Sequence, residues 1–216
     1  RYTVVAVKAY DSAAAARHVK GLAVVAQNGV GGLEAFGERA VPAVVTYGVY
    51  REGCRSQLRG VGEIVLPREA GELGEWLKNG GAVVKIVDDV EPYRWLKLAV
   101  NAAINAITAV LQRENGVVAE SPHARELAAA VAREVEAVAK ALGVRLPEDP
   151  VGEVLKVAAA TAANLSSTAR DLRLCVKTEV DFINGAVVRY GERLGVATPY
   201  NRSLYLLVKT LEERCG

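Results

Sequence analysis

Three polar side chains recur at helical spacing in an otherwise apolar stretch of this 216-residue chain. Lys97, Asn101 and Asn105 are four residues apart, so they follow one face of an α-helix with a drift of about 40° per step. The rest of that helix is apolar, so we expect it to be buried, and a buried lysine must gain a partner or lose its charge. One ammonium and two amides suit a small anionic, hydroxylated ligand. The spacing fits equally well a structural network in which the amides cap loop carbonyls and Lys97 extends outward.

A second polar group lies between residues 164 and 185. It contains the run Ser166-Ser167-Thr168 and, further along, Glu179 in the opening turn of a predicted helix. A carboxylate in a first helical turn is favoured by the helix dipole, so Glu179 is also typical of an ordinary cap. The three hydroxyls are equally consistent with the end of a helix, where they bond back to its carbonyls.

A third polar group follows two predicted strands. Gln27-Asn28-Gly29-Val30-Gly31-Gly32 comes directly after one strand, and Lys8 closes the strand before it. Open α/β folds bind ligands at the carboxyl ends of their strands, so we expect Asn28 and Lys8 to share a ligand-binding edge. An Asn-Gly pair is also ordinary turn chemistry.

Two kinds of element must position these groups, and the first is a sheet within residues 1–90. Short β-branched runs predict its strands, which are Thr3–Val7, Leu22–Ala26, Val41–Val49, Gly62–Leu66 and Ala82–Val87. A helix at Ser12–Lys20, capped by Asp11 or Ser12, gives a strand-helix-strand unit of a parallel sheet. A second helix is predicted at Ala70–Lys78, and the later strands are expected to finish the same sheet.

The second kind of element is helical, because apolar residues recur with a helical period throughout 91–216. The predicted helices run from Pro92 to about Arg113, from Ser121-Pro122 to Gly143, over Val151–Leu165, from Thr178 to about Gly195 and over Ser203–Arg214. Thr178 with Asp181 resembles a capping box, and Asn201 is the expected cap of the last helix. The apolar face of Arg125–Leu142 fits either an internal core or a second subunit.

Composition argues against several classes of protein. With 27 basic and 25 acidic residues and no basic run, nucleic acid is not the expected partner. No apolar window reaches the roughly 20 residues of a membrane span, and no signal-peptide pattern is visible at Arg1. We therefore expect a cytoplasmic protein with a small-molecule substrate.

The cysteines Cys54, Cys175 and Cys215 are odd in number and far apart, which supports neither a metal cluster nor a secreted disulfide framework. We expect buried or free thiols and no bound metal. The excess of Arg over Lys and of Glu over Asp points to a thermophilic source, in which one intracellular disulfide is compatible with this count.

The ordered set of motifs resembles the ketopantoate reductase (2-dehydropantoate 2-reductase) family from Tyr2 to about Glu212. The family's Trp-x-Lys-x-x-x-Asn-x-x-x-Asn-x-x-Thr-Ala helix is matched at Trp95, Lys97, Asn101, Asn105, Thr108 and Ala109. Other matching segments are Val5–Lys8, Gln27–Gly31, Asn115-Gly116, Ser166–Asp171, Thr178–Gly185 and Gly195–Asn201. The sequence departs from the family at Thr168, which replaces a Met, and at Val176, which replaces a basic residue.

The resemblance implies a Rossmann-like NAD(P)-binding domain in residues 1–90 and an all-α substrate and dimerisation domain in 91–216. It also implies reduction of 2-dehydropantoate to pantoate, a step toward coenzyme A, with NADPH or NADH. The family's roles would make Lys97 the general acid and Glu179 the residue that orients the substrate hydroxyl. The implied substrate pocket is lined by Asn28, Asn101, Asn105, Asn115 and Ser167, and the implied cofactor contacts are Lys8, Asn28 and Glu179.

This chemistry agrees with the residue types. Hydride delivered to a carbonyl carbon leaves an alkoxide, which a positioned ammonium stabilises and protonates. The nicotinamide is expected between Asn28 and the helix of Lys97. The resemblance also implies a homodimer as one of the two interpretations of the apolar helix faces, with an internal core as the other.

One family feature is missing from the sequence. No Gly-x-Gly-x-x-Gly motif for a pyrophosphate occurs, and the chain begins with Arg1 and contains no Met. We therefore expect the first strands of the nucleotide-binding domain to lie upstream of Arg1. Two alternatives remain open, namely a related 2-keto acid reductase of the same fold and a helical dimerisation fragment without its nucleotide-binding half.

Overall fold

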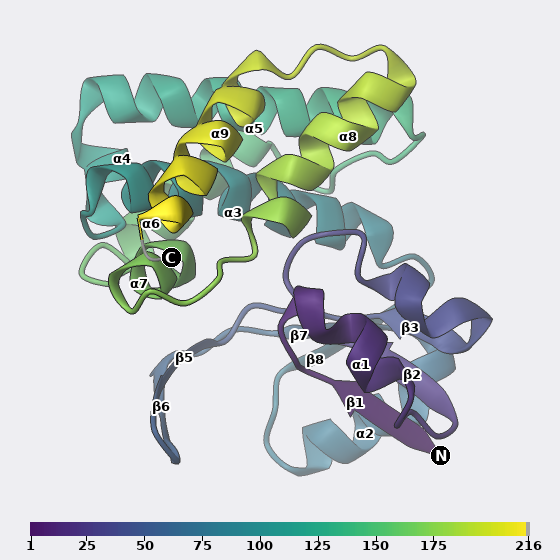
Figure 1. Ribbon diagram of the computed structural model, residues 1–216. Helices are drawn as coiled ribbons and strands as arrows, with labels where there is room; N and C mark the ends of the chain where they lie inside the picture. The colour runs from purple at the N-terminus through teal and green to yellow at the C-terminus, as the bar shows by residue number, and fades with distance from the viewer. Residues whose placement is uncertain (215–216) are drawn as a thin grey trace. The chain divides into compact units, whose positions relative to one another are not determined.

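The computed structural model describes residues 1–214, apart from the side chains of Arg51 and Glu52. The chain forms two compact units (Figure 1), which are described separately. The first unit contains Arg1–Gln27 and Gly32–Arg94, and the second contains Asn28–Gly31 and Trp95–Gly216. The chain therefore changes unit after Arg94, and the short turn Asn28–Gly31 belongs with the helices.

The first unit begins with the predicted strand-helix-strand arrangement. Strands β1 (Tyr2–Val5) and β2 (Leu22–Val25) pair in parallel, with helix α1 (Ser12–Ala16) between them in sequence. β3 (Ala40–Pro42) extends this sheet in parallel beside β2. Asp11, one of the two predicted caps, takes the N-cap position of α1 but makes no side-chain capping bond. The Ser12 hydroxyl donates at 2.7 Å to the carbonyl of Ala9, the first residue of the 3-10 turn η1 (Ala9–Asp11), and does not cap α1.

Val41–Val49 is not one strand, contrary to the sequence analysis. β3 ends at Pro42, which has no amide hydrogen to continue a ladder. β4 (Val44–Val45) instead pairs antiparallel with β7 (Ile64–Pro67), and β7 pairs in parallel with β8 (Val84–Val87). The later strands therefore form a second three-stranded sheet, β4-β7-β8, rather than completing the first one.

A hairpin and two helical segments complete the first unit. Strands β5 (Gly48–Glu52) and β6 (Arg55–Gly60) pair antiparallel, and β6 is exposed along its whole length. Helix α2 (Gly71–Asn79) confirms the predicted helix after a 3-10 turn, η3 (Arg68–Ala70). A longer 3-10 segment, η2 (Leu33–Arg39), precedes β3.

The second unit is helical and is built around α3 (Glu91–Leu111), whose residues from Trp95 onward lie in it. The other helices are α4 (Gly116–Glu120), α5 (Pro122–Ala141), α6 (Pro150–Ala160), α7 (Ser167–Arg173), α8 (Asn184–Leu194) and α9 (Pro199–Glu213), with a 3-10 turn, η4 (Val180–Phe182). Figure 1 shows α5 running behind α9 and α8. The apolar face of α5, including Val131 and Val135, is buried in this chain's own core, so the internal alternative accounts for its pattern.

Some helix starts follow the predicted capping chemistry. The Ser121 hydroxyl accepts from the Ala124 amide ahead of Pro122, and Gly143 adopts a positive φ just after α5, as predicted. Ser166 caps the start of α7 by accepting from the Ala169 amide at 3.2 Å, so its hydroxyl begins a helix and does not end one.

Three predictions of this kind are wrong. Thr178 and Asp181 do not cap α8, which begins at Asn184, because the Thr178 side chain bonds to Glu212 instead. Glu179 consequently precedes the 3-10 turn η4 and does not lie in the first turn of an α-helix. Asn201 lies inside α9, fully buried, where its amide donates to Glu134 and to the Val131 carbonyl.

Candidate active site

The side chain of Lys97 lies partly buried on α3 and donates to Asn28 Oδ1 at 2.9 Å. Burial lowers the pKa of Lys97 from 10.5 to about 8, while the attraction of the Glu179 carboxylate opposes this shift. A lysine with this pKa is charged at neutral pH and gives up its proton more readily than an ordinary lysine. The structure therefore places a usable proton donor on the polar face of α3.

Asn28 connects Lys97 to Glu179. Its Nδ2 donates to Glu179 Oε2 at 3.4 Å, while its Oδ1 accepts from Lys97. The Glu179 side chain is only 5% exposed, so a carboxylate is held in a largely dry place. We call these three residues the Lys97–Asn28–Glu179 chain, and all of them belong to the second unit.

The backbone after Asn28 explains how this residue reaches the helical unit. Gly29 has φ of +80°, and a Cβ at this position would lie 2.1 Å from the Phe182 carbonyl oxygen. The next amide, that of Val30, donates to the same oxygen at 2.9 Å. Phe182 closes η4, three residues after Glu179. A glycine is therefore required here, and its contact with Phe182 brings Asn28 to Glu179.

The other amides on α3 lie close to the start of α7. Asn105 Nδ2 donates to the exposed Ser167 Oγ at 3.5 Å, and Thr108 Oγ1 donates to Ser166 Oγ at 2.7 Å. Asn101 lies one turn from both Lys97 and Asn105 and is partly exposed. The structure thus joins Asn105 and Ser167 directly, and the partly exposed Asn101 lies between Lys97 and Asn105 on α3.

Asn115, just before α4, holds an unusual buried acceptor. Its Nδ2 donates to Thr161 Oγ1 at 2.9 Å, and the Thr161 hydroxyl in turn donates to the Val157 carbonyl at 2.7 Å. Asn115 Oδ1 is buried and has no hydrogen-bond partner among residues 1–214. A buried acceptor left in this state is available to a ligand donor.

The sequence analysis missed Thr108, Thr161 and Ser166 as supports of this region, although Thr108 is part of the motif match. Each acts through a hydrogen bond to a residue 46 to 58 positions away or to a local carbonyl. Only the Ser166-Ser167 pair gave a local signal, for which the end of a helix was one of the two open interpretations.

Lys8 lies in the first unit, in the segment that follows the end of β1 at Val5. The side chain of Gln27, which follows β2, donates to the Val7 carbonyl at 3.1 Å and to the Lys8 carbonyl at 3.4 Å. The carboxyl ends of the two parallel strands are therefore tied together, as expected for one edge of a sheet.

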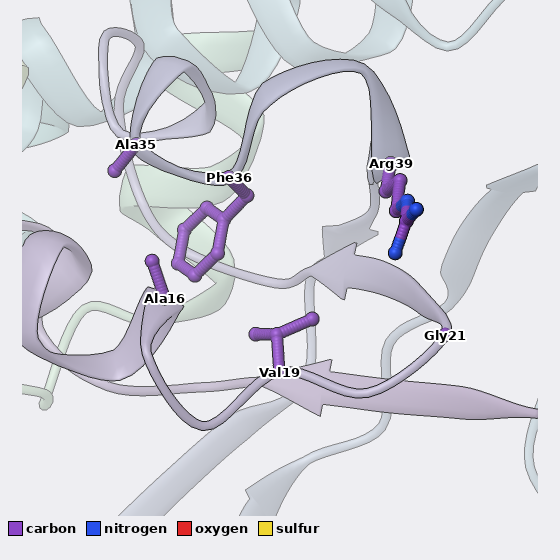
Figure 2. Close-up of a pocket in the computed structure, with 6 residues that line it drawn as sticks. All are labelled: Ala16, Val19, Gly21, Ala35, Phe36 and Arg39. Atoms are coloured by element: carbon purple, nitrogen blue, oxygen red, sulfur yellow. The ribbon is translucent and has the colours of Figure 1, made fainter.

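A cavity of about 190 Å³ opens elsewhere in the first unit and is lined by Ala16, Val19, Gly21, Ala35, Phe36 and Arg39. Figure 2 shows the Phe36 ring, Val19 and Ala16 turned toward the same space, with Arg39 to one side. Gly21 and Arg39 precede β2 and β3, so this cavity adjoins the amino ends of those strands. It lies at the opposite edge from Lys8.

The cysteines differ in state. Cys54 is an exposed free thiol, as expected, whereas Cys175 is disulfide-bonded, and Cys215 lies outside the described residues. Within residues 1–214 no cluster of three or more His, Cys, Asp or Glu side chains is arranged to hold a metal ion. The part of the chain that the structure describes also contains no helix with the length and apolarity of a membrane span.

Comparison with known proteins covers both units. The family model described as "Ketopantoate reductase PanE/ApbA C terminal" matches residues 89–212. The 2-dehydropantoate 2-reductase of Pyrobaculum aerophilum is 64% identical over 218 residues, which cover 100% of this chain and 78% of that protein. The corresponding protein of Archaeoglobus fulgidus is 37% identical and matches 97% of this chain and 76% of its own length.

Solved structures give the same fold. The crystal structure of a ketopantoate reductase from Ralstonia eutropha JMP134 is similar with a TM-score of 0.87 and 29% identity, over 99% of this chain and 76% of that one. A D-mandelate dehydrogenase in complex with NADH has a TM-score of 0.90 at 22% identity, over 100% of this chain and 80% of that one, which shows a shared fold alone. The architecture is thus a partial Rossmann-like α/β unit followed by a helical unit. With motifs, family model and relatives in agreement, the chain belongs to the ketopantoate reductase family.

Proposed function

We propose that this protein reduces 2-dehydropantoate to pantoate with a nicotinamide cofactor and that Lys97 is the proton donor. The observation that carries the proposal is the Lys97–Asn28–Glu179 chain, in which a partly buried lysine with a pKa of about 8 bonds to an amide beside a buried carboxylate. The relatives named 2-dehydropantoate 2-reductase support the substrate.

Lys97 suits the proton-transfer half of this reaction. Reduction of a ketone produces an alkoxide, and an ammonium within hydrogen-bonding distance stabilises that charge and then protonates the oxygen. The carboxylate of a 2-keto acid lies next to its keto group, so the same ammonium attracts both ends of the reacting unit. Asn28 fixes the orientation of the Lys97 ammonium, because Asn28 Oδ1 accepts a hydrogen bond from one of its three N–H groups.

The residues present fit a nicotinamide cofactor. The Lys97–Asn28–Glu179 chain offers a proton but no electrons, so a reduction here needs a separate hydride donor, which NADPH or NADH supplies when bound. We assign Lys8, Asn28 and Glu179 as the residues of this chain that hold the cofactor. Lys8 and Asn28 each follow the carboxyl end of a parallel strand, where α/β folds bind nucleotides.

The remaining amides form the proposed substrate pocket together with Ser167. Asn101 is partly exposed one turn from Lys97, and Asn115 Oδ1 is a buried acceptor that a substrate hydroxyl would satisfy. Asn105 and Ser167 bond weakly to each other at 3.5 Å, so a ligand oxygen competes for both groups at little cost. Glu179 is assigned to the substrate hydroxyl as well. We also propose that the protein forms a homodimer.

Lys97→Ala tests the proposal. In the intact protein, assayed with 2-dehydropantoate and either NADPH or NADH, this change should lower kcat by about 10²- to 10⁴-fold, as expected for loss of a general acid. The exposed Lys140 on α5 provides a matched control, and Lys140→Ala should keep wild-type turnover. Near-normal turnover of Lys97→Ala, with its circular dichroism unchanged, would remove Lys97 from the mechanism. Faster reduction of a different 2-keto acid would reassign the substrate.

A further inference from the structure

We propose that Glu212 and Lys209 of α9 are positioning residues that hold Glu179 beside Lys97 by fixing the backbone on both sides of it. The inference rests on the proposed function, because it explains how the carboxylate of the Lys97–Asn28–Glu179 chain is kept in place. Glu179 lies in a segment without regular α-helix, between α7 and α8, so its own secondary structure does not fix it.

The residue before Glu179 is anchored by Glu212. Glu212 Oε1 accepts from the Thr178 amide at 2.8 Å and from the Thr178 hydroxyl at 2.6 Å. The same hydroxyl accepts from the Val180 amide at 3.2 Å, so the contact spans both neighbours of Glu179. Thr178 is fully buried, and no other side chain among residues 1–214 accepts its two donors. Loss of this carboxylate would therefore leave a buried amide unsatisfied.

The residues after Glu179 are anchored by Lys209 and Tyr205. Asp181 Oδ1 accepts from the Tyr205 hydroxyl at 2.9 Å, and Asp181 Oδ2 accepts from Lys209 Nζ at 3.3 Å. Lys209 Nζ also donates to Glu212 Oε2 at 2.6 Å. Because Lys209 bonds to both carboxylates, it joins the anchor before Glu179 to the anchor after it.

The charges in this cluster support one another. Burial acts to raise the pKa of Glu212, but hydrogen bonds from Lys209 and Thr178 outweigh it and hold the pKa below its usual value. Burial likewise acts to lower the pKa of Lys209, and its bonds to Glu212 and Asp181 leave that pKa above the usual value. Both groups are therefore ionised throughout the neutral range, and the contact is a charge-assisted one.

The contact at the other side of the segment explains why position matters. Phe182 O accepts from the Val30 amide in the turn that carries Asn28, so α9 and this turn hold the same five-residue stretch, 178–182, from two directions. Glu179 raises the pKa of Lys97 by its charge, and that effect decreases with distance. If α9 released the segment, Glu179 would move and the pKa of Lys97 would fall.

Two substitutions of Glu212 separate its contacts. Glu212→Ala removes the acceptor for Thr178 and the partner of Lys209, whereas Glu212→Gln keeps a carbonyl oxygen for Thr178 and loses the charge and the acceptor for Lys209, which still bonds to Asp181. In Glu212→Ala we expect kcat/KM to fall about tenfold and its alkaline limb to move to lower pH by about half a pH unit or more. In Glu212→Gln, kcat/KM and the pH of its alkaline limb should both stay close to the wild-type values. Glu213→Ala, at the neighbouring exposed residue, is the control and should match the wild type.

A second measurement does not depend on turnover. The pKa of Lys97, followed by NMR of the intact protein with ¹³C-labelled lysine and no added ligand, should fall in Glu212→Ala and change little in Glu212→Gln. An unchanged pKa in a folded Glu212→Ala protein overturns the proposal, whatever its activity. If Glu212→Ala does not fold, Lys209→Met removes the ammonium that joins Glu212 to Asp181, and an unchanged Lys97 pKa in that folded variant also overturns the proposal.

This design also separates the two proposals. If Lys97→Ala proves active, the proposed proton donor is wrong, yet the NMR measurement still decides whether α9 positions Glu179. If Lys97→Ala is inactive and the pKa of Lys97 does not respond to Glu212, the proposed function stands and the positioning role fails.

Discussion

At the scale of single residues, the charge of Lys97 serves the proposed proton transfer but lowers the stability of the folded protein. Its pKa is lowered to about 8 in the folded protein, against 10.5 for an ordinary lysine. The folded state therefore binds fewer protons than the unfolded state between about pH 8 and pH 10.5, and folding becomes more favourable as the pH rises through this window. Below it, the protein keeps a charged amine in a dry place at a cost in stability.

This cost predicts how the stability of the Lys97→Met variant differs from wild type, because methionine has a similar length to lysine and carries no charge. At pH 7 the variant should gain in free energy of unfolding relative to wild type, and the gain should shrink as the pH approaches 10. Denaturant unfolding of both proteins at pH 7, 8.5 and 10 measures the difference, from which other titrating groups cancel. A difference that is constant across this range would show that Lys97 has an ordinary pKa.

Gly29 makes a prediction at the same scale. Gly29→Ala must move the Phe182 carbonyl, because the new Cβ would lie 2.1 Å from it, and the positive φ adds about 1 kcal/mol of strain. Gly195→Ala, at φ of +69° with no atom of the described chain within 4 Å, carries the strain alone. We expect Gly29→Ala to lower the melting temperature further than Gly195→Ala and to lower kcat/KM as well. Equal losses in both would mean that the contact with Phe182 is dispensable.

At the scale of elements, helix starts with a complete local signature were predictable. Ser121-Pro122 holds the cap and the first helical residue side by side, and the structure confirms both. The same logic failed at Thr178, where the pattern of a capping box is present but a carboxylate 34 residues away takes both donors. Local spacing cannot reveal a partner that only tertiary folding supplies. Strand β6 escaped prediction for another reason, since all its residues are exposed and its single large apolar residue, Leu58, gives no apolar periodicity.

The two serine caps provide an element-scale prediction. Ser121→Ala should destabilise the protein by about 1 kcal/mol, the usual value of a helix cap, without changing kcat/KM. Ser166→Ala removes the cap of α7 and the partner of Thr108 on α3, so it should destabilise more and also lower kcat/KM through Ser167 and Asn105. Thermal unfolding and steady-state kinetics of both variants test this difference. Identical effects of the two substitutions would contradict the assignment of Ser166 to the site.

At the scale of the whole molecule, the sequence predicted the order of the two architectures and the helix that carries Lys97. It did not predict that Asn28–Gly31 belongs to the helical unit, because the signal for this turn, an Asn-Gly pair after a strand, concerns only its local shape. The partners of Asn28 are 69 and 151 residues away in the sequence. Long-range placement of this kind follows from packing, and the motif resemblance was the only sequence feature that joined the three residues in advance.

The membership of this turn restricts how such a protein can be recombined. The chain changes unit after Gln27, after Gly31 and again after Arg94, so no single cut separates the units cleanly. A chimaera that takes its helices from this protein and its sheet from an α/β protein outside the family would replace Asn28 and Gly29 along with the sheet. Lys97 would then lose its hydrogen bond to Asn28. Exchange of whole halves is therefore compatible with a working donor only if four residues from the first half travel with the second.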